Sequence, residues 1–168
     1  TGLAATLAYM NPAELSTYGQ LLIFGTGGAG AGYLVAQRIG PTELPEAVAA
    51  FHSLVGLAAL STAVGDYMVH DLAHSTVFHD TSTYLGAWMG SITATGSVIA
   101  WGKLSENMSS NALALSQRDN INMALGGVSA ASMLAFVGSS SPAITTAALG
   151  AGVVSSGALG LHMTASIG

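Results

Sequence analysis

The sequence has no cysteine and very few charged residues. Of its 168 residues, 3 are basic and 8 are acidic, so that 7% are charged, whereas soluble domains carry about a quarter. Without cysteine there is neither a disulfide framework nor a thiolate metal site. Three basic residues are too few for a nucleic-acid interface, which excludes nucleic acid as a partner. So little charge indicates a surface that meets lipid rather than water.

The few charged residues are separated by long intervals that contain none. A membrane-spanning helix needs about 20 mostly apolar residues, and the intervals supply five such stretches. We therefore predict an all-α fold, a polytopic transmembrane bundle in one domain, with spanning helices at about 15–38, 43–67, 81–104, 119–138 and 143–165. We also predict that residues 1–10 are a fragment of a further helix, which ends at Asn11-Pro12. Because both ends fall in apolar sequence, we expect them to be cuts through a larger membrane domain.

The basic residues predict the orientation of this bundle. Arg38 lies between the first two helices, and Lys103 and Arg118 lie between the third and fourth. Connecting segments 66–80 and 138–142 contain no lysine or arginine. By the positive-inside rule, the three basic residues and the C-terminus lie on the inner side and segment 66–80 on the outer side.

Residues 25–30 match the pattern GxGxxG, which in a strand–turn–helix context marks dinucleotide binding. Here the motif is followed by further predicted helices and not by the parallel strands that dinucleotide binding requires. We therefore interpret it as part of a glycine-rich spanning helix. Small residues four apart let helices pack closely in a membrane. On this basis we predict helix-packing positions at Gly28, Gly32, Gly56, Gly86 and Gly90.

His52 is an ionisable residue near the middle of the second predicted helix. Such a group is costly inside a membrane and often functional, and imidazole changes charge near neutral pH. We therefore predict a proton-transfer role, with the ring facing the interior of the bundle or a water-lined cavity. Thr93, Ser97 or a polar side chain of a helix outside this chain should lie near it. Thr93 and Ser97 share a helix face and would extend a polar path. The alternative is a neutral histidine hydrogen-bonded between helices for packing.

Segment 66–80 contains histidines and aspartates whose irregular spacing matches no metal site. We interpret it as a solvated outer loop and predict no metal ligands. No nucleophile–base arrangement and no phosphate-binding lysine occur in the sequence, so we predict neither catalytic nor cofactor-binding residues on this chain.

Two long segments of the sequence are distinctive, namely residues 43–59, ELPEAVAAFHSLVGLAA, and residues 90–104, GSITATGSVIAWGKL. Together with residues 84–86 and the terminal HMTASIG, they resemble the membrane domain of proton-translocating nicotinamide nucleotide transhydrogenases. The resemblance runs from about residue 18 to the end and is strongest in residues 43–59.

This resemblance implies a function that the composition alone does not. The family transfers hydride between NAD(H) and NADP(H) on two soluble domains and couples it to proton movement through the membrane domain. The histidine matching His52 is the family's proposed proton carrier. Together with the predictions above, this implies a proton pathway of His52, Ser53, Thr93, Ser97 and Asn122.

The implied partners lie outside this chain. They are membrane lipid, the remaining transhydrogenase helices, and the domains that bind NAD(H) and NADP(H), in a dimer or larger complex. The implied membrane is the mitochondrial inner membrane or the bacterial plasma membrane.

The sequence also departs from the family pattern. A Pro-Gly-Arg-His loop reads Ser116-Gln117-Arg118-Asp119 here, and two helices expected after Gly168, one with an asparagine thought to work with the histidine, are not in this sequence. These departures leave an alternative open, a non-catalytic structural membrane subunit derived from a transhydrogenase segment.

Overall fold

The computed structural model describes residue 8, residues 15–69 and residues 75–167, and every regular element among them is an α-helix. The helices are α2 (Leu15–Ala36), α3 (Leu44–Val69), α4 (Val77–Leu104), α5 (Arg118–Gly138) and α6 (Pro142–Ala165). The prediction of an all-α fold is confirmed. The predicted fragment at residues 1–10 lies outside the described residues, apart from Ala8.

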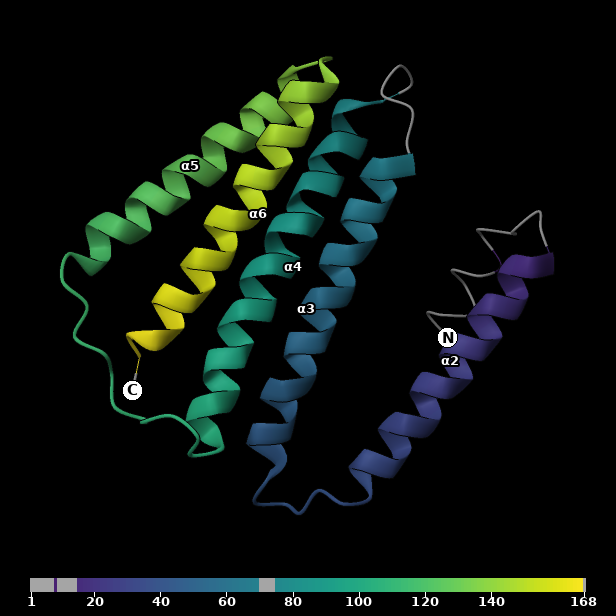
Figure 1. The fold of residues 1–168 in the computed structure, drawn as a ribbon, viewed down its shortest axis with the longest axis vertical. Coiled ribbons are helices and arrows are strands. Elements are labelled where there is room, and N and C mark those ends of the chain that lie inside the picture. Colours follow the sequence, from purple (N-terminus) through teal and green to yellow (C-terminus); the bar gives the residue numbers. More distant parts are fainter. Residues whose placement is uncertain (1–7, 9–14, 70–74, 168) are drawn as a thin grey trace. The chain divides into compact units, whose positions relative to one another are not determined.

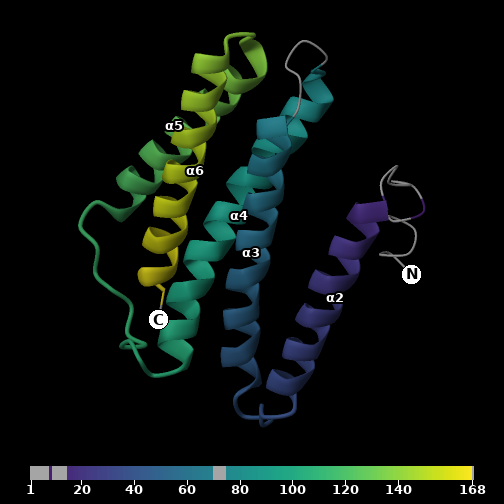
Figure 2. The ribbon, with the colours of Figure 1, turned by 45° about the vertical axis from the view of Figure 1, so that its right-hand side comes forward.

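The chain divides into two compact units, residues 1–42 with α2 and residues 43–168 with α3 to α6. In the second unit, α4 packs between α3 and α6, and α5 packs mainly against α6 (Figures 1 and 2). Helix α2 includes residues 21–30, so the residues before the glycine motif are helical and do not form a strand.

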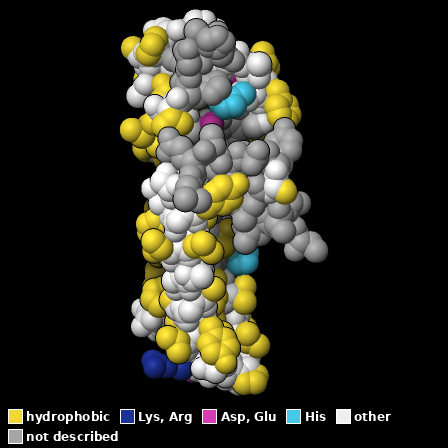
Figure 3. All heavy atoms as spheres, turned by 90° about the vertical axis from the view of Figure 1, so that its right-hand side faces the viewer, with side chains coloured by type: hydrophobic (Ala, Val, Ile, Leu, Met, Phe, Trp, Pro, Cys, Tyr) yellow, Lys and Arg dark blue, Asp and Glu magenta, His cyan; other side chains and the backbone are white. Residues whose placement is uncertain are grey.

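The interior of the second unit contains many small residues beside Tyr84, Phe136, Leu149 and Leu159, whereas many large apolar residues face outward. Among its buried residues are three alanines of α3 and α4, Ala63, Ala87 and Ala94. By contrast, Leu134 and Val154 are 76% and 72% exposed. One face of the molecule likewise shows mostly hydrophobic and uncharged side chains (Figure 3). This inverts the pattern of soluble proteins and is typical of helices packed in lipid.

Three of the five helices are long and apolar enough to cross a membrane, namely α3, α5 and α6. At 1.5 Å per residue, even the 21 residues of α5 extend about 31 Å, close to the thickness of the hydrocarbon layer. Helix α4 has 28 residues but carries Asp80, Lys103 and several hydroxyl side chains, which lower its hydropathy. The structure thus supports three of the five predicted spans.

Helix α4 begins at Val77, four residues before the expected position. The side chain of Thr76 accepts a hydrogen bond from the backbone N–H of His79 and caps the helix. Such a cap satisfies a backbone donor that the first turn leaves unpaired. The acidic group of Asp80 in the first turn is also favourable, because the helix dipole is positive there. His79 and Asp80 therefore belong to a helix, although the charge pattern had placed them in a loop.

The basic residues of the second unit lie at one of its two ends. Lys103, at the end of α4, and Arg118, at the start of α5, lie at one end. At the other end, Ser75 and Asp80 line the same pocket as Ser140. This agrees with the orientation expected of Lys103, Arg118 and Ser140. His70, Asp71, His74 and Gly168 lie outside the described residues.

A labelling experiment tests this orientation, because the sequence contains no cysteine. Single cysteines are introduced as Ser140→Cys and Ser109→Cys, and intact cells or sealed vesicles are treated with a membrane-impermeant thiol reagent. We expect Ser140→Cys to be labelled from the outer side and Ser109→Cys only after the membrane is opened. Labelling of both variants from the same side would contradict the prediction that α5 crosses the membrane between these two positions.

Lys103 closes the C-terminal end of α6. Its Nζ donates hydrogen bonds to the backbone carbonyls of Ala165, at 3.0 Å, and Ile167. The last carbonyls of a helix have no partner within the helix, and a cation there interacts favourably with the helix dipole.

Replacing Lys103 with methionine should therefore loosen the end of α6. We expect a loss of about 1 kcal/mol of local stability, the upper end for a cation at an exposed helix terminus. Faster hydrogen exchange confined to residues 160–167 would report it. Lys103→Arg retains the charge and serves as the control; equal exchange in both variants and the parent would show that the contact contributes nothing.

Candidate proton-translocation site

His52 lies on α3, about 12 Å along the helix from Leu44. Its ring is exposed within the unit formed by α3 to α6, so it does not face the interior of this unit, and its place in the complete bundle stays a prediction. Ser53 and Gly56 are the buried residues nearby, and only a small side chain fits where α3 and α4 meet. Since successive helix residues point about 100° apart, burying Ser53 turns His52 outward. A further partner for the ring therefore has to come from outside this four-helix unit.

The hydrogen bond of the ring indicates how it carries its proton. Nδ1 of His52 lies 3.0 Å from the carbonyl oxygen of Val48. A carbonyl only accepts, so Nδ1 has to hold the hydrogen in this bond. In the neutral ring, Nε2 then carries the lone pair and is the nitrogen that takes up a proton. The contact to Val48 thus fixes the tautomer and leaves Nε2 as the exchanging atom.

The predicted hydroxyl groups do not gather around His52. Ser53 is buried, and its Oγ donates to the carbonyl of Ala49 in the same helix, at 3.3 Å. Thr93 and Ser97 lie together along a groove of about 350 Å³ that Thr164 of α6 also lines. His52 does not line this groove. The structure therefore brings Thr93 and Ser97 together on one side of α4 and places His52 elsewhere.

Asn122 pairs with a histidine that the sequence did not single out for this role. Its Oδ1 lies 2.7 Å from Nδ1 of His162, which joins α5 to α6. Since the amide oxygen only accepts, Nδ1 of His162 carries the hydrogen. The two residues are 40 positions apart, so helical periodicity could not have paired them. The available signal was the ionisable character of His162 near the end of a spanning helix.

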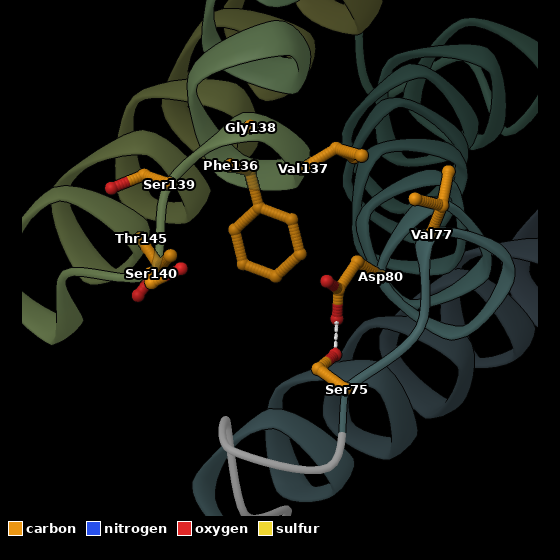
Figure 4. Close-up of a pocket in the computed structure, with 9 residues that line it drawn as sticks. All are labelled: Ser75, Val77, Asp80, Phe136, Val137, Gly138, Ser139, Ser140 and Thr145. Atoms are coloured by element: carbon orange, nitrogen blue, oxygen red, sulfur yellow. Dashed lines mark hydrogen bonds between the residues drawn. The ribbon is translucent and has the colours of Figure 1, made fainter.

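A second group of ionisable side chains lies where α3 ends and α4 begins. Nε2 of His79 is 3.0 Å from Oδ2 of Asp66 on α3, and its Nδ1 is 3.5 Å from Oδ1 of Asp80. Thr83 donates a hydrogen bond of 2.8 Å to the same Asp66 oxygen. Ser75 donates to Asp80 beside a pocket of about 160 Å³, into which the ring of Phe136 points (Figure 4). Sequence reasoning placed Asp66, Ser75, His79 and Asp80 in a solvated loop.

Two of the predicted packing glycines lie directly against a neighbouring helix. A Cβ built at Gly56 would be 2.4 Å from the backbone nitrogen of Ala94, and one at Gly90 would be 2.4 Å from that of Leu60. At Gly86 the nearest atom would be the Cβ of Ala63, at 3.3 Å. The positions predicted on α2 have no such neighbour: nothing in the described structure lies within 4 Å of a Cβ at Gly28 or Gly32. Packing at these two stays a prediction.

Hydroxyl groups join α4, α5 and α6 through hydrogen bonds between helices. Thr95 donates to the carbonyl of Gly157 at 2.9 Å, and Tyr84 to that of Ser129 at 2.7 Å. Ser129 and Ser155 are bonded through their Oγ atoms at 2.8 Å. Inside a membrane such bonds strengthen helix association. These bonds hold α4, α5 and α6 together. Helix α3, which carries His52, packs against α4.

Comparison with known proteins identifies the group to which this arrangement belongs. Two curated proteins, both named NAD(P) transhydrogenase subunit beta and both from Rhodospirillum rubrum, are 41% identical to this chain over 90 residues. The aligned region covers 50% of this chain and 19% of each relative, so the chain matches only a small part of their length. The family model described as NAD(P) transhydrogenase beta subunit matches residues 1–168. With its three apolar helices, this integral membrane chain belongs to the NAD(P) transhydrogenase beta subunit family.

Proposed function

We propose that this chain is the membrane proton-translocation segment of a transhydrogenase that couples hydride transfer between NAD(H) and NADP(H) to proton movement. All five helices would span the membrane, which is either a bacterial plasma membrane or the mitochondrial inner membrane. The nucleotides would bind to other domains. Further helices and the nucleotide-binding domains complete the assembly, as a dimer or larger complex.

The position of His52 carries this proposal. An ionisable ring about 12 Å from the start of an apolar helix of 26 residues is costly unless it has a polar environment. Its exposed face on the four-helix unit is where a further helix or a file of water can reach it. The bond to Val48 sets Nε2 as the proton-exchanging nitrogen. A proton carrier needs an exchanging atom that faces its donor and acceptor, and this geometry provides one.

Coupling would follow from a change in which side of the membrane reaches His52. A conformational change in the NADP(H)-binding domain would favour one of two states of the bundle, and each state would give the ring a different environment. Proton binding would in turn bias the nucleotide-binding states, because coupling between two sites is reciprocal. The tightly packed α3 and α4 would move together in such a change.

A structural role for the chain is the alternative function. The close contacts at Gly56 and Gly90 and the hydroxyl bonds between helices would suit a packing subunit without transport. The two functions differ in what His52 contributes. The test compares proton uptake during hydride transfer in the complete transhydrogenase with and without a substitution at His52. Loss of proton uptake supports the proton carrier, and undiminished uptake supports the structural subunit.

A further inference from the structure

The group formed by Asp66, His79 and Asp80 places two carboxylates on either side of one imidazole ring. Both ring nitrogens face a carboxylate oxygen, at 3.0 and 3.5 Å. A neutral imidazole can donate a hydrogen bond from only one nitrogen, whereas the protonated ring donates from both. The ring thus lies between two carboxylates, each of which can accept a hydrogen bond from it. We call these three residues the outer acid–histidine group.

Charge and exposure suit this group to exchange protons with water. The side chains of Asp66, His79 and Asp80 are 42%, 29% and 19% exposed. Among the described residues, neither α5 nor α6 contributes a histidine or a charged residue at this end of the unit. Of the described charged residues, Asp66 on α3 and Asp80 on α4 lie beside His79. No three ligands in the described part of the chain are arranged to hold a metal ion, so the ligand that fits best is the proton.

A groove extends from this group along α3 as far as Ala59. It has a volume of about 540 Å³ and is lined by Ala59, Thr62, Ala63, Asp66, Phe78, His79, Ser82, Thr83 and Gly86. Its size exceeds the roughly 30 Å³ that one water occupies in the liquid, so it has room for a file of water. Asp66, His79 and Thr83 give the groove polar groups, and most of its remaining lining is small or apolar.

The helical register puts His52 on the same side of α3 as the groove. Positions 52, 59 and 66 are seven residues apart, and an α-helix drifts only about 20° per seven residues. Ala59, which lines the groove, lies about 10 Å along the helix from His52, and Asp66 about 21 Å. The same face of α3 therefore carries the outer group, the groove and the proton carrier in succession.

We propose that the outer acid–histidine group collects protons at the outer surface and exchanges them with His52 through water in this groove. The step conserves charge: an acid in the outer solution gives a proton to His79 or a flanking carboxylate, which passes it through the water file to Nε2 of His52. The reverse sequence releases a proton outward. This inference rests on the proposed function, since it assigns to His52 its outer source of protons.

The test uses the complete transhydrogenase in proteoliposomes at low buffer concentration. His79→Gln and Asp66→Asn remove the exchanging groups, whereas Glu106→Gln removes an exposed carboxylate beyond the other end of α4. We expect coupled hydride transfer to fall about 10-fold in the first two variants, less than the roughly 100-fold typical of a proton-transfer group at the reacting atoms, and to be unchanged in Glu106→Gln. Imidazole added to the outer solution should restore the rate, because a mobile buffer replaces the collecting group.

The outcomes separate this inference from the proposed function. Full activity of His79→Gln and Asp66→Asn at low buffer overturns the inference, and so does a loss that outer imidazole does not restore, which indicates a structural role. Uncoupled exchange between bound nucleotides checks that each variant is folded, and Asp66→Glu, which keeps the carboxylate, should keep the rate. The proposed function itself fails only if His52→Ala retains coupled transfer.

Discussion

Replacing His52 with alanine is expected to abolish most of the proton-coupled hydride transfer in the complete transhydrogenase. We expect a fall of about 100-fold, as is common when a positioned proton-transfer group is removed. Uncoupled exchange between bound nucleotides should continue, because the nucleotides are proposed to react on other domains. Both rates are measured in the same membranes, so that differences in protein amount cancel.

Val55→Ala is the matched control for this substitution. Val55 lies one turn after His52 on α3 and is 61% exposed, so its loss removes volume from the same region without removing a proton-binding group. We expect Val55→Ala to retain coupled transfer. If His52→Ala also retains it, the ring is a packing residue and the bond to Val48 only satisfies its Nδ1. If both variants lose it, the effect comes from the shape of this surface and not from the imidazole.

The helices could be predicted from the sequence because charge is so costly in lipid. Charge-free intervals located all five elements, with bounds within four residues of those observed. The largest difference, at the start of α4, has a local cause. Asp80 and His79 were placed in a loop because they are polar, but Thr76 caps the helix before them and Asp66 pairs with His79. Polar residues can extend a helix where a neighbouring helix supplies their partners.

Which helices pack together could not be predicted, and this limited the account of the site. Periodicity along one helix gives the face of a residue but not the helix opposite. It grouped Thr93 with Ser97, which do line one groove. It could not reveal that Asn122 meets His162, or that the small residues next to His52 turn its ring away from α4. Contacts between distant residues, and surfaces completed by other chains, carry no local signal.

Substituting Gly90 with alanine should destabilise the bundle, although alanine is the better helix former. The added Cβ would lie 2.4 Å from the backbone nitrogen of Leu60 and 2.8 Å from the carbonyl oxygen of Gly56. Backbone atoms inside a helix cannot move aside, so α3 and α4 would have to separate. Overpacking of this kind costs about 1–3 kcal/mol, and separation of the helices also loses contacts along α3. We expect a lower thermal denaturation midpoint for the purified protein in detergent.

Gly86→Ala supplies the matched control, because it makes the same change one turn earlier on the same helix. Its added Cβ would meet only the methyl group of Ala63, at 3.3 Å, and a shift of a few tenths of an ångström relieves that contact. Replacing glycine with alanine in a helix otherwise gains about 1 kcal/mol, so Gly86→Ala should be neutral or stabilising. A similar midpoint for both variants would contradict the close approach of α3 and α4 at Gly90. Opposite shifts would show that the contact between helix backbones, and not the helix propensity of glycine, decides the stability of this pair.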